Sequence, residues 1–236
     1  MVYVMSDIHG NLERFNSVMS QINLQPEDTL YVLGDVADRF PDGIEILLKL
    51  MSMPNVKMLL GNHDYMLSKS VKLGVKSGIF DIWEYNGGNC TYKAFMKLPE
   101  EDRKRIIEYI DGLPLNIDIE VSGKKYKLVH GSPLDWFGKT RESLMYRDAE
   151  EYAIWGRIRR HDGEGSDYTV IFGHTPTINY QYSPLMSIWY GKNLIGIDCG
   201  SGFADSVACK YRLACLRLDD MKEFYSEVKA VDSNDD

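Results

Sequence analysis

Polar side chains that could bind metal ions follow several apolar, strand-like runs of the 236-residue sequence. The clusters SDIHGN, GDVADR and GNHD each follow such a run, and single histidines follow two later runs, in VHG and FGH. A histidine at one strand end is usually structural, but four of the five histidines occur in this setting, beside two aspartates. The candidate metal ligands are Asp7, His9, Asp35, Asn62, His130 and His174.

The types and spacing of these residues indicate the kind of metal centre. Asp7 and His9 are two residues apart, so in an extended segment both side chains would face the same cation. The two oxygens of Asp35 could bridge two metal ions about 3.5–4 Å apart. Carboxylate, amide and imidazole groups together suit Mn, Fe or Zn better than Ca or Mg, which prefer oxygen ligands alone. Cysteine is absent from the set, so a structural zinc site is not indicated.

Strand and helix patterns alternate in the first third of the chain, which predicts parallel strands with helices packed outside them. The strands are expected at VYVMS, TLYVLG and VKMLL, and the helices at NLERFNSVMSQI and DGIEILLKLM. Short strands dominate after residue 115, and the last two, separated by DDMKE, resemble an antiparallel hairpin. We therefore expect an α/β (α+β) fold, a four-layer αββα sandwich of two stacked mixed β-sheets flanked by helices. The metal site should lie at the C-terminal ends of the strands.

The chain is expected to form one domain over residues 1–236, because no linker-like segment divides it. Residues 65–113 read as a mostly helical insertion with YNGGNC as a loop, and 206–218 read as one strand. The acidic tail, residues 232–236, is expected to fray.

Composition excludes some classes of partner and indicates a compartment. With 27 Lys and Arg against 35 Asp and Glu, the net charge is −8, which argues against binding a nucleic-acid polymer or an anionic membrane. No apolar run has membrane-spanning length, and MVYVMSDIHG shows no basic segment followed by a long apolar run, so neither a membrane span nor a targeting segment is expected. The four cysteines form no CxxC pair, so we expect free thiols and a cytoplasmic location. Nothing resembles a coiled coil, and oligomeric state is left open.

The motifs DIHGN, GDVADR, GNHD, VHG and FGHTP, in this order, resemble those of the calcineurin-like metallophosphoesterase superfamily. GDxxDR together with GNH and an acidic residue is similar to its phosphoprotein phosphatase branch. EYNGGN and IWGRIR resemble the bacterial and phage-type serine/threonine phosphatases, which are related to symmetrical bis(5′-nucleosyl)-tetraphosphatases. Two departures are visible. Asp64, a residue type that many bacterial relatives share, stands where protein phosphatases commonly have Glu, and FPDG replaces the Gly-Pro that often follows the arginine at position 39.

The resemblance implies a role for each site residue. One metal would be held by Asp7, His9 and Asp35, and the second by Asp35, Asn62, His130 and His174. A bridging water or hydroxide would attack phosphorus in line. The phosphoryl group would be bound by Arg39, by Asn62 and by Arg157, with Arg159 as the alternative to Arg157. His63 would protonate the leaving oxygen, and Asp38 would hold His63 in the required tautomer.

The function implied is that of a metal-dependent phosphomonoester hydrolase with two divalent transition-metal ions, manganese first and iron or zinc as alternatives. Its substrate would be a protein carrying phosphoserine, phosphothreonine or phosphotyrosine, or a small phosphoester. Symmetrical hydrolysis of diadenosine tetraphosphate is the alternative within this family. A non-catalytic, metal-binding scaffold is another, although a scaffold would be expected to have lost a ligand or the general acid. Aromatic residues near the motifs read as packing residues or as a substrate rim: Trp83, Tyr85, Trp136, Tyr146, Tyr180 and Tyr182.

Overall fold

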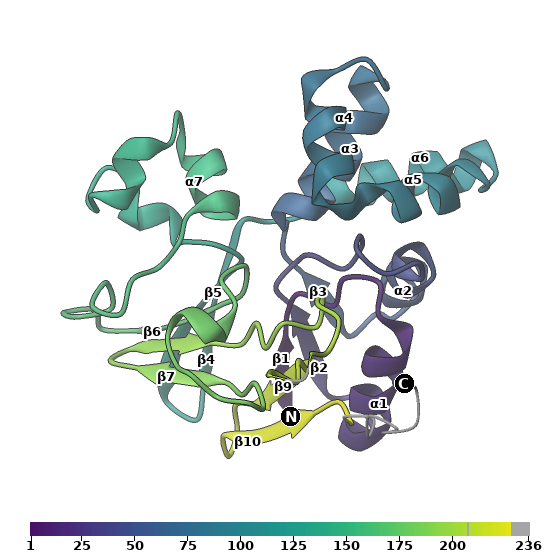
Figure 1. Cartoon of the computed structure of the whole chain (residues 1–236). Coiled ribbons are helices and arrows are strands. Elements are labelled where there is room, and N and C mark those ends of the chain that lie inside the picture. The colour runs from purple at the N-terminus through teal and green to yellow at the C-terminus, as the bar shows by residue number, and fades with distance from the viewer. Residues whose placement is uncertain (207, 228–236) are drawn as a thin grey trace.

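Two five-stranded β-sheets form the centre of the computed structural model, which describes residues 1–206 and 208–227 (Figure 1). The first sheet has the order β10-β9-β1-β2-β3. Its strands are β1 (Val2–Met5), β2 (Thr29–Val32), β3 (Val56–Met58), β9 (Ala214–Arg217) and β10 (Lys222–Tyr225). β1, β2 and β3 are parallel, whereas β9 is antiparallel to β1 and forms the predicted hairpin with β10.

The crossovers between the parallel strands are helices, as the alternating pattern predicted. α1 (Leu12–Ile22) follows β1, and α2 (Gly43–Met51) follows β2. Asn11 caps α1, because its side chain accepts a hydrogen bond from the backbone N–H of Arg14 at 3.1 Å. Phe15, Val18 and Ile22 are buried on the face of α1 that packs against the first sheet.

The second sheet has the order β4-β5-β6-β8-β7 and is also mixed. Its strands are β4 (Asn116–Val121), β5 (Lys124–Val129), β6 (Thr169–Phe172), β7 (Trp189–Gly191) and β8 (Leu194–Gly196). β5, β6 and β8 run parallel, and the antiparallel strands β4 and β7 form the two edges. As in the first sheet, the parallel strands lie together, and the motifs with His130 and His174 follow the C-terminal ends of β5 and β6.

The two sheets stack on a shared apolar core. Leu33 and Leu216 from the first sheet region are buried in one cluster with Leu128 and Ile171 from the second. The outer face of the second sheet is covered by Tyr152 and by other apolar residues from the segments that hold four short helices. The four helices are η2 (Leu134–Trp136), η3 (Glu142–Met145), α7 (Ala149–Trp155) and η4 (Thr177–Asn179). The prediction of two stacked mixed sheets flanked by helices is confirmed.

Helices follow β3 and project beyond the strand ends on one side, opposite α7 (Figure 1). They are α3 (Asn62–Leu73), α4 (Gly78–Trp83), the π-helical turn η1 (Glu84–Gly88), α5 (Asn89–Met96) and α6 (Glu100–Asp111). The prediction of a loop at YNGGNC was wrong: the segment is helical, with a kink at Gly87, where φ is 98°. Glycine adopts this left-handed conformation without steric cost, so the chain turns inside a helical segment.

The predicted strand over 206–218 was also wrong in length. Among residues 206 and 208–218, which the structure describes, only β9 is a strand, while Lys210 and Arg212 form isolated bridges to two different partners, Leu185 and Gly200. Because each bridge has its own partner segment, this stretch cannot continue one ladder. The acidic tail 232–236 lies outside the described residues. That the whole chain forms one domain, with 65–113 as an insertion, stays a prediction.

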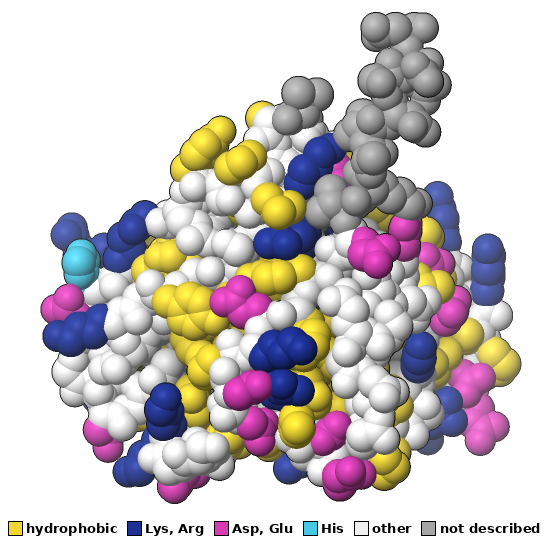
Figure 2. All heavy atoms as spheres, turned by 90° about the horizontal axis from the view of Figure 1, so that it is seen from below, with side chains coloured by type: hydrophobic (Ala, Val, Ile, Leu, Met, Phe, Trp, Pro, Cys, Tyr) yellow, Lys and Arg dark blue, Asp and Glu magenta, His cyan; other side chains and the backbone are white. Residues whose placement is uncertain are grey.

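The surface of the face away from the helical projections carries charges of both signs. In Figure 2, Lys and Arg side chains alternate with Asp and Glu side chains, and no continuous basic field is visible on this face. Within residues 1–206 and 208–227, no helix has both the length and the apolar character needed to cross a membrane.

Candidate active site

All six predicted metal ligands lie beyond the C-terminal ends of parallel strands. Asp7 and His9 follow β1, and Asp35 follows β2. Asn62 follows β3 as the first residue of α3, so the predicted strand tip GNHD is in fact the start of a helix. His130 and His174 follow β5 and β6 of the other sheet. The strand order brings residues from both sheets to one place, as their common position had predicted.

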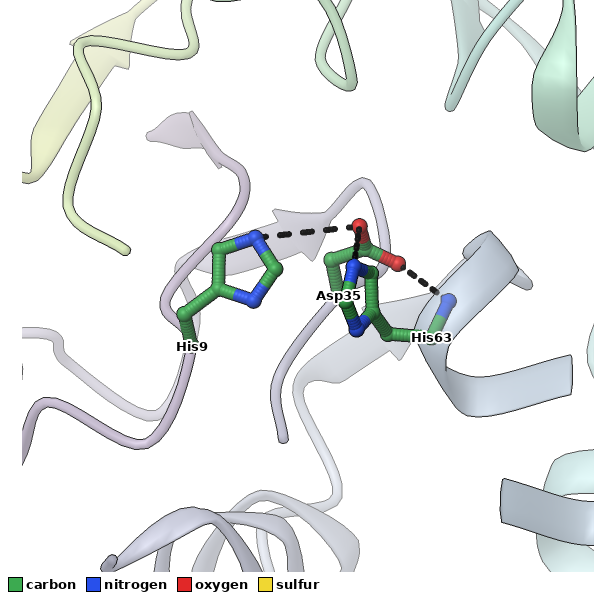
Figure 3. A group of neighbouring side chains, drawn as sticks. All are labelled: His9, Asp35 and His63. Carbon is green, nitrogen blue, oxygen red and sulfur yellow. Dashed lines mark hydrogen bonds and ion pairs between the residues drawn. The ribbon is translucent and has the colours of Figure 1, made fainter. Parts of the chain in front are cut away.

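One cluster forms around the Oδ2 atom of Asp35 on the side of the first sheet (Figure 3). Nε2 of His9 lies 3.8 Å from it, and Nε2 of His63 lies 4.0 Å from it. Asp7 is beside this cluster, with its Oδ1 3.8 Å from Nε2 of His9. The structure thus brings His63 to the cluster, in addition to Asp7, which sequence reasoning had grouped with His9 and Asp35.

Asp7 and His9 do not reach the cluster through an extended segment, and that part of the prediction was wrong. Their φ angles are 54° and 53°, in the left-handed region, and Asp35 has a φ of 55°. Backbone hydrogen bonds hold this turn: the N–H of Asp7 donates to Gly34 at 3.2 Å, and that of His9 to Asp35 at 3.0 Å. Left-handed non-glycine residues are uncommon and gather at functional sites, where the surroundings hold them in place.

A second cluster consists of Asp35, His130 and His174. Nε2 of His130 lies 3.4 Å from Oδ2 of Asp35. The amide oxygen of Asn62 lies 2.9 Å from Nε2 of His130 and 2.8 Å from Nδ1 of His174. Asp35 therefore belongs to both clusters, in the place that a bridging carboxylate would occupy.

The tautomers of two histidines fit the binding of metal ions. Nδ1 of His9 lies 3.1 Å from the carbonyl oxygen of Ala37, and Nδ1 of His130 lies 2.7 Å from that of Leu33. A backbone carbonyl accepts a hydrogen bond, so Nδ1 of each ring carries a proton, and Nε2 is the ring nitrogen that faces the carboxylates. Metal-binding histidines are commonly oriented in this way. The buried Nε2 of His174 has no hydrogen-bond partner among the described residues.

In the second cluster, the carboxylate of Asp35 and the imidazole of His130 each stabilise the charged form of the other. Burial would raise the pKa of Asp35, but the imidazoles of His130 and His63 outweigh it and hold this pKa well below its ordinary value. Burial would lower the pKa of His130, but Asp35 outweighs it and raises this pKa to about 9. The anionic carboxylate thus holds a proton on its neighbour, and a divalent cation would take the place of that proton.

The other candidate ligands are shifted mainly by burial. Burial, followed by repulsion from Asp35, raises the pKa of Asp7 despite the attraction of His130. Burial lowers the pKa of His9 and of His174, and nearby positive charges add to both shifts. These two imidazoles are therefore held neutral, which is the form that binds a metal ion.

His63 and Asp38 form a buried pair, as the resemblance implied. Nδ1 of His63 lies 2.7 Å from Oδ2 of Asp38. Burial would lower the pKa of His63, but the carboxylates of Asp35 and Asp38 outweigh it and raise this pKa. Nη2 of Arg39 lies 3.4 Å from Nε2 of His63, so the free side of the imidazole faces the arginine.

The candidate arginines differ in their surroundings. Arg39 is exposed, with its guanidinium 5.0 Å from the ring centre of Phe203. Nη1 of Arg157 donates to Oγ1 of Thr175 at 3.3 Å, next to His174 in the sequence. Arg159 forms a 2.8 Å ion pair with Glu142. Of the two, Arg157 is therefore the one that contacts a neighbour of the candidate ligand His174.

Sequence reasoning missed the role of Asp64, which it treated as a family variation. Asp64 is buried in the first turn of α3, and its Oδ2 accepts hydrogen bonds from the N–H of Asp35 at 2.8 Å and of Gly61 at 3.1 Å. Burial and the nearby Asp35 raise the pKa of Asp64 to about 7. A Cβ on residue 61 would lie 2.2 Å from Oδ1 of Asp35, so the close approach of Gly61 to Asp35 requires glycine. The only signal in the sequence was an acidic residue at the third helical position.

We expect Asp64→Ala to lower the free energy of unfolding of the metal-free protein by about 1–3 kcal/mol, because buried N–H donors lose their acceptor. Denaturant unfolding measures this change. Asp64→Asn retains a carbonyl oxygen and should lose less. Equal stability of all three proteins would contradict the role assigned to the carboxylate.

Comparison with known proteins agrees with this geometry. Residues 1–203 match the family model described as calcineurin-like phosphoesterase. The chain belongs to this family, and it is a metallophosphoesterase, a hydrolase that acts on phosphoester bonds.

Two similar proteins carry the names of different phosphoester hydrolases. The serine/threonine-protein phosphatase 2 of Escherichia coli (strain K12) is 29% identical over 213 residues, covering 85% of this chain and 87% of that protein. A symmetrical bis(5′-nucleosyl)-tetraphosphatase of Yersinia pestis (strain Pestoides F) is 39% identical over 79 residues, covering 33% of this chain and 26% of that protein. Among solved structures, a metallophosphoesterase from Sphaerobacter thermophilus shares the fold, with a TM-score of 0.57 and 18% identity over 97% of this chain and 89% of that one.

Proposed function

We propose that this protein is a metal-dependent protein phosphatase that removes phosphate from phosphoserine and phosphothreonine, with phosphotyrosine as a further substrate. The observation that carries the proposal is the extent of the similarity. The match to serine/threonine-protein phosphatase 2 covers 85% of this chain and 87% of that relative, whereas the match to the tetraphosphatase covers 26% of the latter. Its substrate would be a phosphorylated protein. The four free cysteines support a reducing compartment such as the cytoplasm.

Residues from both sheets would hold two divalent transition-metal ions, manganese first and iron or zinc as alternatives. The ligands would be Asp7, His9, Asp35, Asn62, His130 and His174. When bound, the ions would supply Lewis acidity and lower the pKa of a water molecule. The shared position of Asp35 and the Nε2 atoms of His9 and His130 that face it support this assignment.

Arg39 and Arg157 would bind the phosphoryl oxygens from two sides, together with the amide of Asn62. A planar guanidinium suits a phosphoryl group, because it can donate two parallel hydrogen bonds. Arg39 lies beside His63, and Arg157 lies beside the residue that follows His174. Arg159 is engaged by Glu142, which favours Arg157 as the second arginine.

His63 would donate a proton from Nε2 to the oxygen that leaves the phosphorus. Asp38 would orient the imidazole, because its carboxylate contacts Nδ1 at 2.7 Å and favours the protonated ring. The raised pKa of His63 supports this role, since a general acid must carry its proton when the bond breaks.

The proposal is tested by offering the manganese-loaded protein a phosphoserine peptide, a phosphotyrosine peptide and diadenosine tetraphosphate side by side. We expect release of phosphate from the phosphoserine peptide and little reaction of the dinucleotide. Preferential formation of ADP from the dinucleotide would instead establish the second candidate function, which the 39% identity to the Yersinia enzyme favours.

Removal of metal should abolish this activity. Treatment with a chelator is expected to stop phosphate release and to lower the melting temperature, because a ligand that binds only the folded state stabilises that state. Added Mn²⁺ should restore both. Phosphatase activity that survives complete removal of metal, as checked by elemental analysis, would contradict the assignment of the cluster.

A further inference from the structure

Two consecutive residues of the proposed site, Asp38 and Arg39, have a strained backbone. Their φ angles are 75° and 69°, and neither residue is a glycine. Such conformations persist only where the surrounding structure holds them. The question is therefore which part of the protein holds the loop that carries the partner of the general acid and a phosphate-binding arginine.

Contacts from the helical segment 83–91 hold this loop. The indole N–H of Trp83 donates to Oδ2 of Asp38 at 2.7 Å. The backbone N–H of Asp38 donates to Oγ1 of Thr91 at 2.9 Å, and that of Arg39 donates to the carbonyl oxygen of Gly87 at 3.1 Å. Gly87 is the kinked glycine of η1, so the unexpected helical conformation of this segment is what presents these groups to the loop.

Oδ2 of Asp38 is shared between two donors from different elements. It lies 2.7 Å from Nδ1 of His63 and 2.7 Å from Nε1 of Trp83, whereas the buried Oδ1 has no partner among the described residues. The orientation of the carboxylate thus depends on the indole as well as on the imidazole. Without the indole, the carboxylate could rotate and carry the imidazole with it.

The indole itself is fixed by its packing. Trp83 is 1% exposed, and its ring packs edge-on against Phe80 at 5.9 Å and Tyr92 at 6.1 Å between ring centres. A Cβ on Gly88 would lie 2.5 Å from the indole, so the ring fills the space that this glycine leaves. Trp83 is therefore a packed residue rather than part of a substrate rim.

We propose that Trp83 is a positioning residue for the general acid: through Asp38, it holds His63 so that Nε2 faces the leaving oxygen. Segment 83–91 supports the same loop through Thr91 and Gly87. The inference rests on the proposed acid role of His63, so its test must separate a failure of that role from a failure of the inference.

The test uses Trp83→Phe, which replaces the indole with a smaller aromatic ring and removes the N–H that donates to Asp38. A series of aryl phosphates with leaving phenols of increasing pKa reports how much the reaction needs a proton, because a more basic leaving group needs more protonation. We expect unchanged metal content and nearly unchanged kcat for the most acidic phenols. For the least acidic phenols kcat should fall by about tenfold to a hundredfold. The plot of log kcat against phenol pKa should be steeper than that of the parent protein but less steep than that of His63→Asn.

A matched control removes an indole hydrogen bond that involves neither His63 nor Asp38. Nε1 of Trp136 donates to the hydroxyl of Tyr168 at 3.0 Å, and Trp136 packs on the outer face of the second sheet. Trp136→Phe should leave the slope of the plot unchanged. Thr91→Val gives an independent variant, because it removes the acceptor of the Asp38 N–H and keeps the volume. It should also steepen the slope, and Thr91→Ser should restore it.

The outcomes separate the two claims. If His63→Asn leaves the slope unchanged, the acid role of His63 fails and the inference fails with it. If His63→Asn steepens the slope while Trp83→Phe lowers kcat equally for all phenols, the acid role stands and the inference about Trp83 is overturned. Should Trp83→Phe not fold, the comparison of Thr91→Val with Thr91→Ser decides whether segment 83–91 positions the acid.

Discussion

Asp35→Asn is expected to weaken the binding of both metal ions together, by at least about 100-fold each, because one carboxylate serves both clusters. Asparagine keeps the size of the side chain but loses its charge and its second anionic oxygen. His9 and His130 would then face a neutral amide instead of a carboxylate that lies 3.8 Å and 3.4 Å from their Nε2 atoms.

Elemental analysis after dialysis against limiting Mn²⁺, together with titration calorimetry, measures this effect. Asp28→Asn is a matched control. Asp28 is also buried, but it lies outside both candidate metal clusters and pairs with the N-terminal amine at 2.6 Å. This control should bind both ions. Retention of one full equivalent of metal by Asp35→Asn would show that Asp35 does not bridge.

His63→Asn is expected to retain both metal ions and to slow the hydrolysis of alkyl phosphates by about 100-fold or more, with a much smaller effect on activated aryl phosphates. An alkoxide is a poor leaving group and requires the proton from His63, whereas an acidic phenol leaves without it. Rates for a phosphoserine peptide and for p-nitrophenyl phosphate, measured at saturation, give the comparison.

This variant also decides between two roles for the imidazole. Nε2 of His63 lies 4.0 Å from Oδ2 of Asp35, close enough for His63 to count among the groups that could hold an ion with His9. Loss of one equivalent of metal from His63→Asn would assign His63 as a ligand. Equal loss of rate on both substrates, with metal retained, would remove it from the acid role.

The sequence predicted the elements that a local pattern determines. The apolar spacing in residues 11–22 matches the buried face of α1, and alternating strands and helices predicted the parallel part of the first sheet. The sequence also placed the polar clusters at strand ends. In the folded chain, these ends bring Asp35 and His130 within 3.4 Å of each other. The helices, the strands and the polar clusters at strand ends could be predicted because each depends on residues that are close together along the chain.

The predictions that failed depend on contacts across the chain or on unusual backbone angles. The left-handed turn at Asp7 and His9 is held by carbonyl groups of residues 34 and 35, which a short-range reading cannot place. The helical conformation at Gly87 is linked to a hydrogen bond with Arg39. The contact between Trp83 and Asp38 spans 45 positions, so nothing near either residue indicated it.

The candidate ligands come from two separately ordered sheets, and this division has a consequence for folding. Asp7, His9, Asp35 and Asn62 belong to the end of the first sheet, and His130 and His174 to the end of the second. Any opening of the molecule that separates the sheets would break the coordination of the second ion, whose ligands Asp35 and Asn62 come from one sheet and His130 and His174 from the other. Bound metal would therefore act as a cross-link, coupling the two halves into one cooperative unit and making their separation the costliest of its local opening reactions.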